Sequence, residues 1–81
     1  MNRNEFVREI AKAKGISRTR AYQSVNAVMD TIRMALLNGD EVEIGGFGTF
    51  AVVKDLKGER IPVFKAGKAL KSVMNISESE E

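Results

Sequence analysis

A long amphipathic segment between residues 18 and 37 constrains this chain more than any other feature. Its apolar residues recur at helical spacing, and about 20 residues at a rise of 1.5 Å predict a helix about 30 Å long. The whole chain has 81 residues, so a thin core must cover a wide apolar stripe. The stripe needs more surface than the rest of one chain offers, which favours a dimer. It comprises Ala21, Val25, Val28, Ile32, Ala35 and Leu36, widened by Tyr22 and Met29.

Capping residues bracket this helix and a shorter one before it. Asn2 or Asn4 can cap a first helix that runs to about residue 14, where Gly15 can take the left-handed conformation that ends a helix. Ser17 is a good N-cap for the long helix, and the pair Asn38-Gly39 is a stop signal. The first 40 residues therefore predict two consecutive helices.

After residue 40 the apolar period changes from helical to two, which is typical of strands. We predict strands over residues 41–44, 47–54 and 59–64, joined by turns at Gly45-Gly46 and at 55–58. Pro62 favours an edge strand, and residues 67–75 predict a last short helix. The expected fold is α+β: two N-terminal helices, a three-stranded antiparallel sheet with a short hairpin arm, and a C-terminal helix. We expect a single domain over 1–76 and an acidic, disordered tail over 77–81.

The composition leaves little for catalysis. The chain contains no Cys and no His, which excludes disulfides, thiolate nucleophiles, Cys/His zinc sites and histidine base catalysis. The acidic residues are scattered, and the glycines at 45–48 lack both the spacing and the following helix of a phosphate-binding loop. We therefore expect no enzyme, no cofactor and no metal.

The net charge of +2 is unevenly distributed along the chain. Residues 1–20 and 44–75 each carry a net charge of +4, whereas residues 21–43 and 76–81 each carry −3. Two basic segments fit a basic face that binds an acidic partner such as nucleic acid. The N-terminus lacks the apolar run of a signal peptide, and no segment approaches the roughly 20 apolar residues of a membrane span. We expect a cytoplasmic protein with no membrane partner.

Two kinds of DNA-binding architecture fit these patterns. A helix-turn-helix motif is suggested by a small residue, a turn glycine and an apolar anchor at Ala11, Gly15 and Ile16. However, Ser24 lies where the recognition helix should be apolar, and the second helix is too long and apolar to lie in a groove. The alternative is a β-ribbon binder with its basic residues on the hairpin and the last helix.

Several sequence blocks resemble the bacterial histone-like family, HU and integration host factor. They are Met1-Asn2-Arg3, Ile10-Ala11, Gly15-Ile16-Ser17, Asn38-Gly39-Asp40, Gly45-Gly46-Phe47-Gly48-Thr49-Phe50 and Pro62-Val63-Phe64-Lys65-Ala66-Gly67-Lys68-Ala69-Leu70-Lys71. The resemblance covers residues 1–52 and 62–75. It implies an intertwined homodimer, with helices below a sheet saddle, that binds and condenses double-stranded DNA in the nucleoid.

The resemblance also implies which residues form the interfaces. Three phenylalanines match the family's central aromatic cluster, and the expected dimer core is Val25, Met29, Ile32, Phe47, Phe50 and Phe64. The expected DNA contacts include four residues that match or adjoin basic positions of the family, Arg3, Lys65, Lys68 and Lys71, and Gly46 of the matching glycine block. Three more, Lys54, Lys57 and Arg60, are basic residues of the shortened hairpin, as expected for a remnant of an arm. The basic residues would contact phosphates.

One departure from the family is pronounced. Family members extend the second and third strands into a long Arg-rich arm with an Arg-Asn-Pro tip, whereas here residues 53–61 alone separate the matching blocks and the tip is Asp55-Leu56-Lys57-Gly58. We expect largely sequence-independent DNA binding, with binding and bending weakened by the truncated arm. The alternative is a protein-interaction module that forms mixed dimers with a full-length relative without binding DNA itself.

Overall fold

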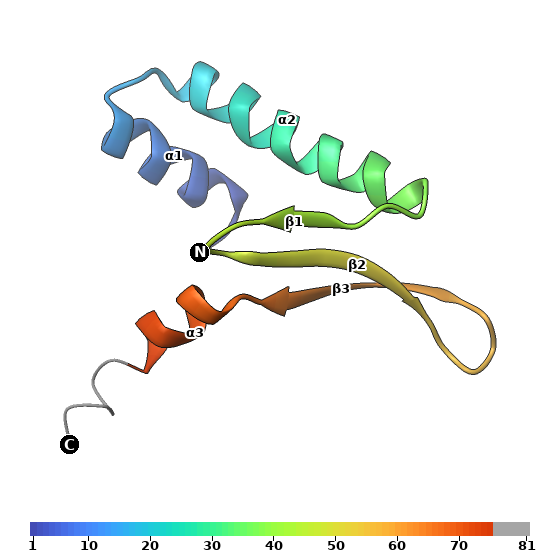
Figure 1. The fold of residues 1–81 in the computed structure, drawn as a ribbon. Helices are drawn as coiled ribbons and strands as arrows, with labels where there is room; N and C mark the ends of the chain where they lie inside the picture. The colour runs from blue at the N-terminus through green and yellow to red at the C-terminus, as the bar shows by residue number, and fades with distance from the viewer. Residues whose placement is uncertain (76–81) are drawn as a thin grey trace. The chain divides into compact units, whose positions relative to one another are not determined.

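The computed structural model describes residues 1–75 and contains three helices and three strands in these residues (Figure 1). In chain order they are α1 (Arg3–Lys14), α2 (Arg18–Leu37), β1 (Val42–Ile44), β2 (Gly48–Lys54), β3 (Arg60–Ala66) and α3 (Lys68–Met74). The backbone divides into two compact units: Met1–Thr31, which we call the helical unit, and the part of the chain from Ile32 onward, which we call the sheet unit. The predicted tail at 77–81 lies outside the described residues.

The capping residues suggested by the sequence begin and end α1 and begin α2. The Asn2 side chain accepts a hydrogen bond from the Glu5 amide at 2.9 Å, and the Glu5 carboxylate accepts one from the Asn2 amide, which forms a capping box. Gly15 ends α1 in the left-handed conformation, with φ of 63°. The Ser17 hydroxyl then accepts a hydrogen bond from the Arg20 amide at 3.1 Å at the start of α2.

The C-terminus of α2 is closed by a Schellman motif. The Asp40 amide donates to the Ala35 carbonyl at 2.9 Å, and the Gly39 amide donates to the Leu36 carbonyl at 3.0 Å. Gly39 has φ of 82°, a conformation that glycine adopts without steric cost. These bonds satisfy the carbonyls of Ala35 and Leu36, but not that of Leu37, at the helix end.

The sheet has the strand order β1-β2-β3, and both neighbouring pairs are antiparallel (Figure 1). The pairing of β1 with β2 extends no further along β2 than Phe50, which faces Val42. Beyond Phe50, β2 and β3 continue as a two-stranded hairpin from Ala51 to Lys54. At the hairpin turn the Asp55 carboxylate accepts hydrogen bonds from the Lys57 and Glu59 amides at 2.8 and 2.9 Å. The predicted type I turn agrees with the bond from the Gly58 amide to the Asp55 carbonyl.

The α+β fold predicted from the sequence is confirmed, with four shifted strand ends. Strands β1 and β2 begin at Val42 and Gly48, each one residue later than expected, and β3 spans Arg60–Ala66 instead of 59–64. Strand β3 runs on past Phe64 because Lys65 and Ala66 pair with Thr49 and Gly48 on β2. Pro62 lies in an edge strand, as expected for a residue without an amide hydrogen.

The two units differ in how much they bury. Val7, Ala11, Ala21 and Val25 form one buried cluster in the helical unit, with Ile10, Ile16 and Met29 packed against it. Among residues 1–75, the buried hydrophobic residue outside that cluster is Ala51 on β2. The sheet unit therefore has almost no closed core within one chain.

Candidate nucleic-acid interface

Five of the predicted DNA contacts are exposed lysines of the sheet unit. Lys54 and Lys57 belong to the hairpin, Lys65 lies on β3, and Lys68 and Lys71 lie on α3. Residues three apart on a helix are neighbours, so Lys68 and Lys71 share one face of α3. Together with Lys65, they concentrate positive charge where β3 leads into α3.

The strand register distributes the basic residues over both faces of the hairpin. Side chains alternate between faces along a strand, and Lys54 faces Arg60 across the pair. Lys54 and Arg60 therefore share the face of Phe50 and Phe64, whereas Lys65 lies on the opposite face with Thr49. Lys65 therefore does not form one patch on the sheet with Lys54 and Arg60.

The face that carries Lys65 is apolar toward the tip. Val53 and Ile61 are cross-strand partners on this face and both are exposed. At the tip itself Leu56 is fully exposed, so it does not pack on the hairpin. The free part of the hairpin thus offers apolar surface on the face opposite Lys54, and Leu56 adjoins Lys57 at the tip.

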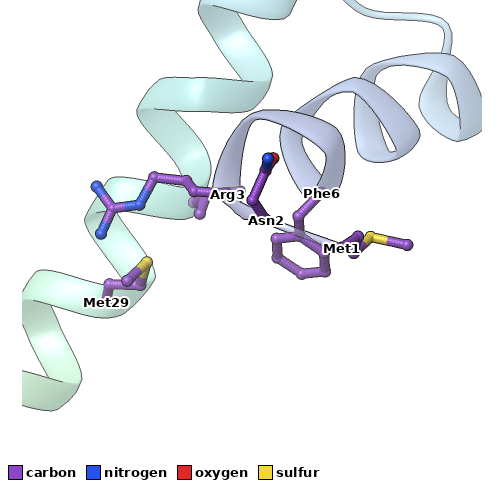
Figure 2. Close-up of a pocket in the computed structure, with 6 residues that line it drawn as sticks. Met1, Asn2, Arg3, Phe6 and Met29 are labelled. Carbon is purple, nitrogen blue, oxygen red and sulfur yellow. The ribbon is translucent and has the colours of Figure 1, made fainter.

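Arg3 lies in the helical unit and is engaged with α2. Its Nη1 donates to Asn26 Oδ1 at 3.3 Å. Figure 2 shows the Arg3 side chain extending toward α2, away from the Phe6 ring. A hydrogen bond from Asn26, and then a hydrogen bond and the positive charge of Arg3, hold the pKa of Tyr22 below its ordinary value.

Arg60 is bound to the end of α2. Its Nη2 donates to the carbonyls of Leu36 and Leu37 at 2.6 and 2.9 Å. A guanidinium is a favourable charge at the negative end of a helix. The sequence suggested a remnant of the DNA-binding arm at this position and gave no sign of this capping contact, because it joins residues far apart in the chain.

Gly46, the remaining predicted DNA contact, occupies a tight turn between β1 and β2. The Phe47 amide donates to the Ile44 carbonyl at 3.0 Å, and Gly46 has φ of 82°. This conformation explains the glycine without a ligand, and a Cβ built at this position meets no atom within 4 Å. A DNA contact at Gly46 stays a prediction.

The three phenylalanines of the sheet unit form a contact cluster. The ring centroid of Phe64 lies 5.3 Å from that of Phe47 and 4.8 Å from that of Phe50, with tilted planes in both pairs. Within one chain Phe47 is 44% exposed and Phe64 40% exposed. An aromatic cluster with two rings this exposed favours an interface in which a second chain buries them.

Gly48 sits directly beneath this cluster. A Cβ at this position would lie 2.5 Å from the Lys65 carbonyl oxygen and 2.6 Å from Cζ of Phe64, closer than real Cβ atoms approach. The glycine-rich motif pointed to this segment, but the reason for the glycine is the close approach of Phe64 across the sheet. Glycine is needed here for space, because its φ is not in the left-handed region.

The predicted dimer-core residues of α2 differ in burial. Val25 is 6% exposed and belongs to the closed cluster of the helical unit. Met29 and Ile32 are half-buried. Phe6, Val25 and Met29 line an apolar hollow beside Met1 (Figure 2). A second hollow along the same helices adds Ile10 and Val28 to these three residues.

Other kinds of site are not seen among the described residues. Within residues 1–75, no three His, Cys, Asp or Glu side chains gather as they do around a metal ion. In the same part of the chain, no helix combines the length and the apolar character needed to cross a membrane.

Comparison with known proteins defines the class. Residues 1–59 match the model of the bacterial DNA-binding protein family. The DNA-binding protein HU of Geobacillus stearothermophilus is 34% identical over 89 residues, which cover 91% of this chain and 99% of that protein. The chain therefore belongs to the HU family of histone-like bacterial DNA-binding proteins. This membership confirms the expectation that the protein is not an enzyme.

Solved structures agree with this assignment. HU from Thermotoga maritima matches with a TM-score of 0.79 and 36% identity, over 91% of this chain and 98% of that one. HU from Anabaena, in a cocrystal with DNA, matches with a TM-score of 0.77 and 28% identity, over 91% and 97% of the two chains. The HU fold favours the β-ribbon architecture over the helix-turn-helix alternative.

The alignments also show that this chain is shorter than its relatives. The alignment with the Geobacillus protein has 89 positions, but 91% of an 81-residue chain is about 74 residues. About 15 aligned positions therefore have no counterpart in this chain. The family model stops matching at residue 59, the last residue before β3.

Proposed function

We propose that the protein is a homodimeric, largely sequence-independent DNA-binding protein of the nucleoid that bends DNA little. Membership in the HU family supports DNA binding, and the DNA cocrystal of the Anabaena relative is a precedent within the fold. The observation that carries the weak bending is the length of the β2–β3 hairpin.

The hairpin extends only a short way beyond the three-stranded part of the sheet. Ala51 to Lys54 add four residues before the turn, or about 13 Å at a rise of about 3.3 Å per residue. This reach is comparable to the width of one major groove, about 12 Å, and does not wrap a duplex. The missing aligned positions and the end of the family match at residue 59 support a deletion in the hairpin.

A second copy of the chain fits the exposed apolar surface. Phe47 and Phe64 are open in the sheet unit, and α2 exposes Val28, Met34 and Leu37. We propose that the partner covers these residues together with Met29, Ile32 and Phe50. Val25 would contribute indirectly, because it packs α1 and α2 together. Burying a side chain of this size contributes about 1.5–3 kcal/mol, so several such residues stabilise a permanent pair.

In the dimer, the exposed lysines would contact phosphates. Contacts of this kind position a protein on DNA without reading sequence. The proposed contacts are Lys54, Lys57, Lys65, Lys68 and Lys71, with Arg3 and Gly46 as further candidates.

Salt-dependent binding to a random duplex tests the DNA-binding proposal. Each phosphate contact contributes about −0.9 to the slope of log K against log salt. We expect a negative slope that is shallower than that of the longer Geobacillus relative measured alongside. Replacing Lys65, Lys68 and Lys71 together with Ala should weaken binding to all duplexes alike. Unchanged binding by this triple variant would remove the β3–α3 site from the proposal.

Fluorescence energy transfer between the ends of a short duplex tests the bending proposal. A sharp kink needs an apolar wedge to offset a few kcal/mol of unstacking per base step. We expect little change in transfer at saturating protein, in contrast to the longer relative. A large rise that Leu56→Ala abolishes would show that Leu56 acts as a wedge and that the hairpin bends DNA.

The second candidate function is a protein-interaction module that pairs with a full-length relative. The exposed Val53, Leu56 and Ile61 at the end of the hairpin favour it, because apolar groups on a hairpin suit a protein surface better than phosphates. Absence of duplex binding at low salt, together with mixed dimers when the two chains are refolded together, would establish this function in place of DNA binding.

A further inference from the structure

We infer that Arg60 is a positioning residue that fastens the β2–β3 hairpin to the C-terminus of α2, and that it does not contact phosphate. The inference deepens the proposed function and rests on it for the DNA-binding part, whereas the fastening itself can be tested without DNA.

The end of α2 offers carbonyl acceptors to a cation from outside its own last turn. The last turn of this 20-residue helix contains no basic residue. The Schellman motif uses the carbonyls of Ala35 and Leu36, and the Leu37 carbonyl accepts no bond within the motif. The negative helix end and this open carbonyl together attract a cationic donor.

Arg60 supplies that donor from the sheet. Its Nη2 lies 2.6 Å from the Leu36 carbonyl oxygen and 2.9 Å from that of Leu37. Hydrogen bonds from a charged donor are stronger than neutral ones. Arg60 also lines a hollow at this helix end, together with Arg33, Leu36, Leu37, Val52 and Pro62.

The position of Arg60 in the hairpin gives this contact its effect. Arg60 is the first residue of β3, opposite Lys54 and directly after the turn. The hairpin is two-stranded here, and a two-stranded ribbon alone is marginally stable in water. A contact at the last pair before the turn therefore limits the motion of the whole free ribbon.

Phosphate binding by Arg60 competes with this contact. The Nη2 group already bridges two carbonyls, and turning the guanidinium so that Nη2 meets a phosphate would release both. Lys57, at the exposed tip, has no such commitment to α2 and serves as the matched control.

Amide hydrogen exchange of the free protein tests the fastening directly. The probe amides are Asp55, which donates to the Glu59 carbonyl, and Gly58, which donates to the Asp55 carbonyl. We expect Arg60→Ala to speed their exchange about tenfold, the effect of losing one charge-assisted interaction. Lys57→Ala should leave them unchanged. Arg60→Lys should recover only part of the protection, because one ammonium keeps the charge but not the planar fork.

Salt titration of DNA binding separates positioning from phosphate contact. A homodimer carries two copies, so losing a true phosphate contact should make the slope shallower by about 1.8. We expect this change for Lys57→Ala. For Arg60→Ala we expect an unchanged slope and a weaker affinity at every salt concentration. If Arg60→Ala does not fold, Arg60→Gln, which also removes the charge but keeps a longer side chain, serves in both experiments.

Two results overturn the inference. Unchanged exchange at Asp55 and Gly58 in Arg60→Lys and Arg60→Ala would show that the hairpin is held by other contacts. A shallower salt slope for Arg60→Ala would make Arg60 a phosphate contact. If the parent protein binds no DNA, the DNA-binding proposal fails, and the exchange experiment still decides whether Arg60 fastens the hairpin.

Discussion

The helical unit and the sheet unit use their apolar residues in different ways. The helical unit closes a small core of Val7, Ala11, Ala21 and Val25 within one chain. The sheet unit holds the larger side chains, yet two of its three clustered phenylalanines are about two-fifths exposed. The first unit is locally complete, whereas the second needs surface that one chain does not provide.

This difference shows where the dimer matters most. Small residues at helical spacing let α1 and α2 approach each other and bury Ala21 completely. Aromatic rings on a narrow sheet have no layer in the same unit large enough to cover them. A second chain should therefore stabilise the sheet unit more than the helical pair.

Removing an aromatic ring should have the largest effect. We expect Phe47→Ala to cost about 3–5 kcal/mol, because a partner chain buries the ring that one chain leaves exposed. The change should also dissociate the dimer, as measured by urea unfolding at several protein concentrations.

Leu56→Ala is the matched control for this prediction. It also removes a large apolar side chain, but from a fully exposed turn, so its effect should stay within about 0.5 kcal/mol. Equal effects of the two variants would mean that Phe47 is not covered in the assembled protein.

Adding one methyl group under the aromatic cluster should have the next largest effect. Gly48→Ala places a Cβ 2.5 Å from the Lys65 carbonyl oxygen, and backbone cannot move aside as a flexible side chain can. We expect a loss of about 1–3 kcal/mol in the free energy of unfolding. Gly45→Ala, where a Cβ meets nothing within 4 Å, should be close to neutral. A neutral Gly48→Ala would show that β2 and β3 are not held this closely.

Loss of the first helix cap should have a smaller, local effect. Asn2→Ala removes the side-chain half of the capping box and should cost about 1 kcal/mol. Asn4→Ala, two residues further on and already within the helix, should cost less. Thermal melts followed by circular dichroism measure both. A loss for Asn4→Ala as large as for Asn2→Ala would place the helix start elsewhere.

The fold was largely predictable because its determinants are local. Asn2, Gly15 and Ser17 act on residues within one turn, so reading them in order predicts both helices. The change of apolar period after residue 40 predicted the strands, and the Asp55–Gly58 pattern predicted the hairpin turn.

The candidate site was less predictable because its geometry is set by pairing across the chain. The strand register places Lys65 on the face opposite Lys54, which a list of basic residues does not reveal. The contact of Arg60 with α2 spans 24 residues to Leu36, and no local pattern indicates it. The proximity of Phe64 to Gly48 likewise depends on the register.

The smallest effect concerns pH and the helical unit. Asn26 and Arg3 hold the pKa of Tyr22 below its ordinary value of 10.0, so the folded protein releases this proton more readily than the unfolded chain. The resulting stabilisation is absent below the folded pKa, grows as pH rises through it, and is complete above 10.0. Tyr22 is the only tyrosine and the chain has no tryptophan, so phenolate absorbance reports it alone.

Arg3→Gln provides the contrast for Tyr22. The substitution removes the charge and one hydrogen bond, so the titration midpoint should move back toward 10.0. An unchanged midpoint would mean that Arg3 does not face Tyr22 in solution and is available elsewhere, for example to DNA.

Sedimentation equilibrium over the micromolar range, with circular dichroism on the same samples, tests most directly whether a second chain completes the sheet unit. We predict a mass twice that of the 8.9 kDa chain wherever the protein is folded, and joint loss of mass and structure on dilution. A folded species of 8.9 kDa with native circular dichroism would contradict the account, because the sheet unit would then be complete in one chain.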